Sequence, residues 1–416
     1  MTVPGSGPKR AYRVYLGLAF AGSLTGALAF TVAAVYFVRE AHFSPLQLVL
    51  NGTVMELTYF VLGVPTGVFA DAFSRRLSVS IGLGLEGLGI MLFGATSSFP
   101  VILAGFAIWG AGAAFFFGAY EAWLTDELGA ENVGGAFLRG ARIGAVGAIV
   151  GIVGSVALAS HSLRLAIELG GALTALQALA YFAMPEHGFT PAPRAGLAPA
   201  VEGAKLVRRK PVLLLMLGIA ACWGMSSESF DRLWEAHFLR DVGLPHIGAL
   251  QPVVWFGILS IGSLLIGIAV NTLLARRIDG ASPRRLARSL LLANVLLVVA
   301  VAAFGLAGGL ALAVSAYWAA RTLRGVGAPL FVTWLNRNIE DSSVRATVLS
   351  ISEQADAIGQ WAGGPAIGAV GNLFGLRAAL LVGAAVLSPA VALYGRALRH
   401  GGEEPELEVL PLPSDA

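Results

Sequence analysis

The sequence predicts an all-α membrane protein of twelve transmembrane helices in two six-helix bundles. Of its 416 residues, 56% are hydrophobic and only 13% are charged, about half the charged share of a soluble protein. Apolar stretches of about 20 residues, long enough to cross a bilayer as a helix, recur along the whole chain. These stretches lack the alternation of a membrane β-barrel, the other structure that satisfies its backbone in lipid.

The first expected span, residues 14–38, is too long for the apolar region of a signal peptide. It ends in Arg39 and Glu40 without a small-residue cleavage site, so we expect it to be retained. The other spans expected in the first half are 46–70, 77–96, 101–124, 140–160 and 163–184. Those expected in the second half are 211–236, 250–275, 286–306, 310–335, 346–370 and 376–398.

Residues 185–210 are rich in proline and then basic, which indicates a flexible linker between the halves. We therefore expect a six-helix bundle in residues 1–184 and a second bundle with a short tail in residues 211–416. Most of the 28 Lys and Arg residues fall on the side that holds the N-terminus, the linker and the C-terminus. The positive-inside rule makes that side, and both termini, cytoplasmic.

The two halves repeat each other at a spacing of about 210 residues, as many secondary transporters do. Asp71 is followed by Arg75 and Arg76, and Asp279 is followed by two arginines at the corresponding place in the second half. Trp123 and Leu124 have their counterparts in a second Trp-Leu pair at residues 334–335. The repeat predicts two related bundles with a binding site between them.

Nearly the whole chain resembles the major facilitator superfamily. The signature turn of that family appears as Gly67, Asp71, Arg75 and Arg76, with Ser74 where the family usually has Gly. The stretches MPEHGF, SSESFDRLWEAHFL and RATVLSISEQADAIGQWAGGPAIG look like bacterial drug:proton antiporters of the tetracycline and macrolide efflux type. The resemblance implies a monomeric transporter in the bacterial inner (plasma) membrane.

The signature turn is expected to act as a gate. The resemblance places Asp71 near the N-terminus of the eleventh span, at Arg345, where the helix dipole favours a negative charge. Asp71 would then latch the two halves together on the cytoplasmic side, with Asp279 as its second-half counterpart. Arg75 and Arg76 would pair with acidic neighbours and fix the topology. In the alternative, the arginines are only positive-inside anchors and Asp71 is a solvated loop charge.

Charges at mid-bilayer depth are candidates for coupling, because each costs about 2.5–3.5 kcal/mol to insert. Arg321 and Arg324 lie in YWAARTLRGVGAPLF, which resembles the proton-transfer motif Arg-x-x-x-Gly-x-Gly-Ala of family antiporters. In the family that motif normally sits in the fourth span, where this chain has Phe106 at the arginine position. The second half is therefore expected to carry the basic role.

The acidic partners are expected from their depth in the membrane. Glu228 and Asp231 are placed near the first of the two arginines and Asp356 near the second. Glu56 stands alone near the middle of the second span, and it is the favoured protonation site of the first half. A carboxyl whose distance to an arginine changes between conformations can load and release a proton. The alternatives are static ion pairs that fix helix register and, for Glu56, a neutral hydrogen-bonded carboxyl.

In this fold the first, fourth, seventh and tenth spans would line the central cavity, and as bounded they contain no Asn or Gln. A sugar site needs such groups because unpartnered buried hydroxyls are costly. Aromatic side chains on these four spans suggest an apolar cavity for a lipophilic compound. The candidate substrate-binding residues are Phe30, Phe116, Tyr120, Trp223, Phe230, Tyr317 and Trp318.

The leading hypothesis is proton-driven efflux of lipophilic small molecules by alternating access. The nearest alternative is an importer or uniporter of an organic anion bound by Arg321 and Arg324, and a non-transporting scaffold is a third. We expect no enzymatic activity, cofactor, metal site or nucleic-acid partner. The chain has no P-loop Gly-Lys-Ser/Thr, its histidines are scattered, and Cys222 is its only cysteine, which excludes an internal disulfide.

Overall fold

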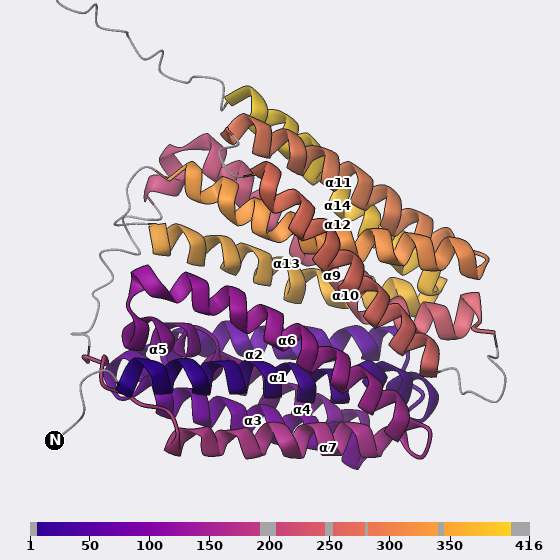
Figure 1. The fold of residues 1–416 in the computed structure, drawn as a ribbon. Helices are drawn as coiled ribbons and strands as arrows, with labels where there is room; N and C mark the ends of the chain where they lie inside the picture. The colour runs from indigo at the N-terminus through magenta and orange to yellow at the C-terminus, as the bar shows by residue number, and fades with distance from the viewer. Residues whose placement is uncertain (1–5, 192–204, 246–252, 279–281, 340–344, 401–416) are drawn as a thin grey trace, which may run out of the picture.

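The computed structural model describes residues 6–191, 205–245, 253–278, 282–339 and 345–400. Within these ranges the fold is all-helical, without strands, and it forms two bundles (Figure 1). The first bundle contains α1 (Ser6–Arg39), α2 (Pro45–Ala72), α3 (Arg75–Ala95), α4 (Phe99–Phe116), α5 (Ala119–Leu128), α6 (Ala130–Ala159), α7 (Leu163–Leu176) and η1 (Gln177–Phe182). The second contains α9 (Pro211–His237), η2 (Phe238–Val242), α10 (Val253–Ile278), α11 (Pro283–Leu306), α12 (Leu310–Arg337), α13 (Arg345–Phe374) and α14 (Leu376–His400).

A helix occupies each of the twelve expected spans, and its ends follow the local sequence. Ser44 closes a capping box with Gln47 at the start of α2, and Ser74, Ser162 and Ser282 cap α3, α7 and α11. These side chains accept hydrogen bonds from backbone N–H groups that have no partner inside the helix. The polar breaks between apolar runs therefore set the helix boundaries.

Ten helical segments of the described chain are long and apolar enough to cross a membrane. α12 and α13 are the long helices outside that group. They carry charged and amide side chains in their middle turns, including Arg321, Arg324, Glu353 and Asp356. Such groups are expensive in lipid and are tolerated where a helix faces other helices or a cavity. The polarity of these two helices indicates that they lie beside the functional site.

The fourth expected span, residues 101–124, is divided in the structure. α4 ends at Phe116 and α5 begins at Ala119, with Gly118 between them at φ 71°. Only glycine adopts this backbone conformation readily. The break redirects α5, which carries Trp123 and the acidic residues that follow it.

Close packing within the first bundle depends on the small residues of α6. Carbonyl oxygens of Phe20 and Leu24 on α1 lie where a Cβ would stand at Gly147 and Gly151. Small residues at this spacing allow helix backbones to approach closely in lipid. The glycine ladder of α6 is therefore a packing surface for α1.

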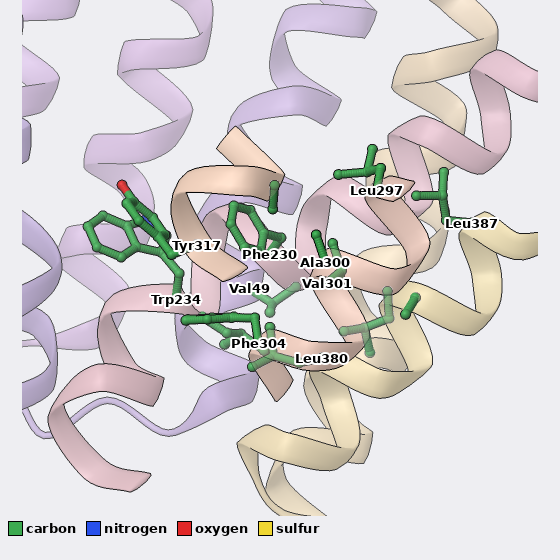
Figure 2. Packing of buried hydrophobic residues seen from close by; sticks show 14 of the residues in the cluster. Val49, Phe230, Trp234, Leu297, Ala300, Val301, Phe304, Tyr317, Leu380 and Leu387 are labelled. Atoms are coloured by element: carbon green, nitrogen blue, oxygen red, sulfur yellow. The ribbon is translucent and has the colours of Figure 1, made fainter. Parts of the chain in front are cut away.

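Aromatic rings fill the centre of the second bundle. Phe230 of α9 packs edge-to-face on Phe304 of α11 and lies against Tyr317 of α12, and all three are almost completely buried (Figure 2). Val49 of α2 joins the same cluster from the first bundle. The hydrophobic core thus runs from one bundle into the other.

The two bundles meet at the end of the molecule that carries Ser44, which we call the Ser44 end. There Arg240 donates a hydrogen bond of 2.7 Å to the carbonyl of Phe43. The backbone N–H of Leu46 donates one of 2.9 Å to Oδ1 of Asn372, at the end of α13. These bonds, together with the packing of α2 on α13, close the Ser44 end.

The opposite end, which carries Ser74, differs in its packing. The last inter-bundle ring contact along α2 is between Phe60 and Trp361, at 6.0 Å between centroids. Beyond it, Val64 is 73% exposed and Val68 is 56% exposed. Because α2 packs on α13 over its first half only, the bundles diverge towards the Ser74 end.

Candidate functional site

A cavity of about 400 Å³ lies between the bundles, among α2, α9, α12 and α13. Its volume is in the range of small-molecule sites. Apolar side chains from α9, α12 and α13 cover much of its wall. The polar and aromatic residues at its wall include Glu56, Tyr59, Trp223, Glu353, Asp356 and Gln360.

Arg232 of α9 reaches across the bundle interface at the edge of this cavity. Its guanidinium lies 3.8 Å from the carboxylate of Glu56 on α2 and 3.5 Å from that of Glu228 on its own helix. It occupies the space that a Cβ would take at Gly52. Glu228 is 1% exposed, so water screens its attraction to the guanidinium only weakly.

Asp231, on the neighbouring face of α9, holds both arginines of α12. Its carboxylate accepts a hydrogen bond of 2.5 Å from Arg324 and lies 3.6 Å from Arg321. The guanidinium of Arg324 also lies 5.9 Å from the ring centroid of Phe230. The three contacts tie α12 to α9 inside the second bundle.

The carboxylates of α13 have no such basic partner. Oδ2 of Asp356 accepts a hydrogen bond of 2.6 Å from the amide of Gln360, one helical turn further on. Among the described residues Glu353 forms no ion pair, and the charges nearest to it are Glu121 and Asp356, both acidic. The α13 side of the cavity is therefore lined by acidic groups.

These contacts differ from several expected ion-pair partners of the charged side chains. Glu56 does not stand alone, because it faces Arg232. Glu228 pairs with Arg232 and not with Arg321. Arg324 pairs with Asp231, and Asp356 binds Gln360. Depth along a helix gave the right layer of the membrane but not the direction in which each side chain points.

Arg232 falls inside the seventh expected span, and no role was expected for it from the sequence. A signal for it was present, because Glu228 and Arg232 are four residues apart in SSESFDRLWEAHFL and so share one face of the helix. Its inter-bundle partner could not be read from the sequence, since the pairing depends on how α2 packs against α9.

One of the expected aromatic residues lies at the wall of this cavity. Of the seven candidates, Trp223 lines the cavity, and its indole N–H donates a hydrogen bond of 2.9 Å to Asn294. The other six pack inside their own bundles, where rings stack on neighbouring helices or donate to backbone carbonyls; they are Phe30, Phe116, Tyr120, Phe230, Tyr317 and Trp318. The wall also contains Gln354 and Gln360 of α13, so amides are present that the four expected spans lack.

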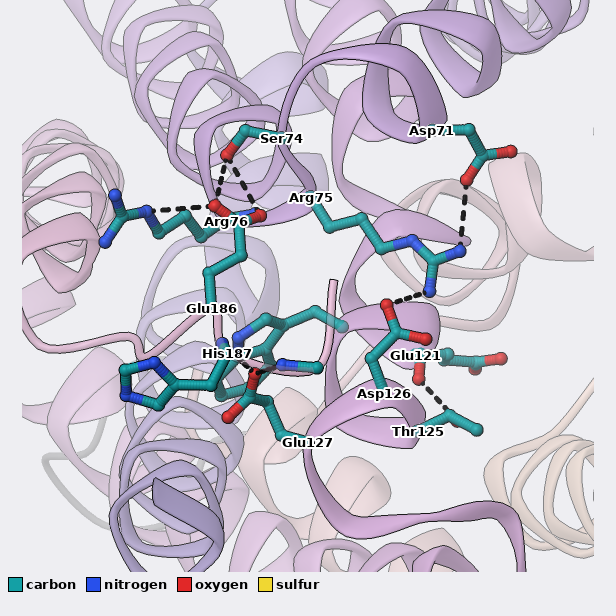
Figure 3. A network of polar contacts seen from close by, with 12 residues as sticks. Asp71, Ser74, Arg75, Arg76, Glu121, Thr125, Asp126, Glu127, Glu186 and His187 are labelled. Atoms are coloured by element: carbon teal, nitrogen blue, oxygen red, sulfur yellow. Dashed lines mark hydrogen bonds and ion pairs between the residues drawn. The ribbon is translucent and has the colours of Figure 1, made fainter. Parts of the chain in front are cut away.

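The turn between α2 and α3 forms a second polar network at the Ser74 end (Figure 3). Arg75 bridges Asp71, at 3.2 Å, and Asp126 of α5, with which it is in close contact. Arg76 pairs with Glu186 at 3.1 Å. The hydroxyl of Ser74 donates to the same carboxylate at 2.8 Å, which gives this serine a contact that glycine could not make.

Residues 185–188, at the start of the linker, are hydrogen-bonded to α5 beside the same network. Glu127 accepts hydrogen bonds from the backbone N–H groups of His187, at 2.6 Å, and Gly188, at 2.8 Å. The indole N–H of Trp123 donates to the carbonyl of Pro185 at 2.6 Å. The signature turn, α5 and residues 185–188 therefore form one rigid corner of the first bundle.

The expected latch between Asp71 and the start of α13 is absent from this conformation. The side chain of Asp71 is 54% exposed and its ion-pair partner is Arg75, four residues along the chain. Among the described residues Asp71 makes no ion pair or hydrogen bond to α13, and residues 340–344, which precede that helix, lie outside the described residues. Asp279 lies outside the described residues. Among the described residues no group of His, Cys, Asp and Glu side chains could hold a metal ion.

Two helical bundles that meet at one end and enclose a charged cavity define a membrane transporter. The chain matches the family model of the Major Facilitator Superfamily over residues 14–351 and belongs to that family. It is 22% identical over 375 residues to the uncharacterized MFS-type transporter YxaM of Bacillus subtilis (strain 168), a match covering 86% of this chain and 89% of that protein.

Solved structures of other transporters share the fold. A mutant of the nucleoside transporter NupG superposes with a TM-score of 0.77 at 13% identity, covering 93% of this chain and 99% of that one. A bacterial homolog of the human lysosomal transporter Spinster, in an inward-facing and unoccupied conformation, gives 0.71 at 16% identity, covering 96% and 98%. This protein is thus a multi-pass transporter of the bacterial plasma membrane.

Proposed function

We propose that this protein is a proton-driven exporter of lipophilic small molecules, and that Glu56 is the carboxyl that couples the proton to the substrate. One observation carries the proposal: Glu56 lines the cavity and also faces Arg232 across the bundle interface. Protonation of Glu56 removes the attraction to Arg232, and it changes the charge of the cavity wall at the same time. A single titration can therefore act on binding and on conformation.

The arrangement of the bundles supports alternating access. With the positive-inside orientation, the closed Ser44 end faces the periplasm and the diverging Ser74 end faces the cytoplasm. This conformation would take up a substrate from the cytoplasm or the inner leaflet. Outward opening must separate α2 from α9 and α13, and it must break the contact between Glu56 and Arg232. That separation frees Glu56 from Arg232, so the carboxyl can take up a proton from the periplasm, and return to the present conformation brings Arg232 back and favours release of the proton to the cytoplasm.

Inverted membrane vesicles test the proposal. An acid interior should drive accumulation of a lipophilic fluorescent dye by the wild-type protein. Glu56→Gln, which keeps the shape of the side chain but not its charge, should lose this pH-driven accumulation while still exchanging dye in the absence of a gradient. Glu40→Gln serves as the control, because Glu40 pairs with Arg164 on the first bundle, away from the cavity.

Unchanged pH-driven accumulation in Glu56→Gln would show that this carboxyl does not couple the proton to the substrate. Accumulation that does not respond to the pH gradient in the wild type would refute proton-driven export itself. The organic-anion alternative has less support, because Arg321 and Arg324 are both held by Asp231 and neither lines the cavity.

A further inference from the structure

The charges of the cavity wall are all of one sign. Three carboxyl groups line it, those of Glu56, Glu353 and Asp356, and among the described residues no Lys or Arg does so. Resting on the proposed transport function, we propose that the substrate is an amphipathic organic cation with flat aromatic groups. Its charge lies against Asp356 and Glu353, and its apolar body lies against Trp223 and the α12 wall.

The nearby bases are engaged elsewhere. Arg232 lies between Glu56 and Glu228, and Arg321 and Arg324 share Asp231. Arg324 is within electrostatic range of Asp356, yet its hydrogen bond goes to α9. The charged neighbours of Glu353 are acidic. At an effective dielectric constant of 20, two unit charges 4 Å apart interact by about 4 kcal/mol, so this wall attracts a cation and repels an anion.

The aromatic groups of the cavity suit the same ligand. The indole of Trp223 is held by its hydrogen bond to Asn294, and Gly327 leaves room for its outer edge, which lies 2.7 Å from where a Cβ would stand. Tyr59 and Phe331 complete an aromatic surface around the carboxyl groups. A cation over such rings gains about 0.5–2 kcal/mol. Fixed rings beside Glu353 and Asp356, which form no ion pair among the described residues, favour a positively charged, aromatic molecule over a neutral lipophile.

A pair of probes with the same shape and opposite charge tests the inference. Tetraphenylphosphonium and tetraphenylborate would be titrated into the purified full-length protein in detergent and into the Glu353→Gln/Asp356→Asn double variant, with protein-free micelles as the measure of partition into the detergent. We expect saturable binding of the phosphonium at least tenfold tighter than that of the borate. The double variant should lose at least tenfold in phosphonium affinity, while Glu40→Gln should bind like the wild type.

Equal or tighter binding of the borate by the wild type would overturn the inference, and so would an unchanged phosphonium affinity in a folded double variant. The wild-type comparison needs no variant, so the inference stays testable if the substitutions impair folding. Transport is read separately in proteoliposomes. Saturable phosphonium binding without flux would uphold the cation site and contradict the exporter proposal. Flux of a neutral lipophile without phosphonium binding would uphold the exporter proposal and contradict the cation site.

Discussion

Arg232 lies between Glu56 of the opposite bundle and Glu228 of its own helix, at 3.8 Å and 3.5 Å. One of these two contacts must break when the bundles separate at the Ser44 end, and the other moves with α9. The guanidinium therefore keeps one partner in both states. This arrangement reduces the penalty of leaving a buried charge unpaired during the transport cycle.

The position of the Arg232 guanidinium against α2 can be tested by substitution of Gly52. A methyl group at this position would occupy the space of the guanidinium, so we expect Gly52→Ala to displace Arg232, to lower stability by about 1–3 kcal/mol and to reduce transport strongly. Gly63→Ala on the same helix is the control, because nothing lies within 4 Å of its Cβ position. Thermal unfolding in detergent and dye flux measure the two effects. Equal thermal stability and equal dye flux in the two variants would contradict this position of Arg232.

The sharing of Asp231 by two arginines predicts a non-additive effect. Asp231→Asn leaves Arg321 and Arg324 without their ion-pair partner, and we expect it to lower stability by about 1–3 kcal/mol. Adding Arg324→Gln removes one of the stranded charges and should recover part of the loss. A double-mutant cycle from thermal or denaturant unfolding measures the coupling. Strict additivity of the two substitutions would show that the close contact at 2.5 Å contributes nothing.

Alternating access predicts opposite distance changes at the two ends. With Cys222→Ser as background, spin labels on Val64→Cys/Ile358→Cys report the Ser74 end, and labels on Leu46→Cys/Leu373→Cys report the Ser44 end. We expect acidification with substrate to shorten the first distance and lengthen the second, as measured by double electron–electron resonance. Changes of the same sign in both pairs would argue against rocking about the cavity.

The signature turn separates a stabilising contact from a gating one. Asp126 is largely buried against Arg75, whereas Asp71 is 54% exposed, and exposed pairs contribute only about 0–1 kcal/mol. We expect Asp126→Asn to lower the melting temperature clearly and Asp71→Asn to leave it nearly unchanged. If Asp71 latches α13 in the outward-facing state, Asp71→Asn should still slow flux. Normal flux in a stable Asp71→Asn variant would show that Asp71 does not act as a latch.

The helices could be predicted from the sequence because two local signals define them. Apolar runs of membrane length place most of them, and residues such as Ser44 and Ser74 mark their starts. The break at Gly118 was missed, since a single glycine in an apolar run commonly continues a helix. The polarity of α12 and α13 was noticed as isolated charges, and the structure shows it to be a property of the cavity wall.

The site was predicted less well than the fold, for a geometric reason. Position along a span gives depth, and depth placed Asp231 in the same layer as Arg321. The direction of each side chain depends on helix rotation and packing, which no local pattern records. The aromatic residues show a related limit: Phe230 and Trp223 lie seven residues apart on nearly the same face of α9, yet Phe230 is buried in the core and Trp223 lines the cavity, because the elements packed against that face change along the helix.

The polarity of α12 also bears on how the chain enters the membrane. A segment carrying Arg321 and Arg324 is a poor candidate for leaving the translocon into lipid alone, whereas Asp231 of α9 has been synthesised about ninety residues earlier. The nascent chain would then hold α9 beside the exit until α12 arrives. Without Asp231, α12 would lack its ion-pair partner during insertion into the membrane, before any transport cycle begins.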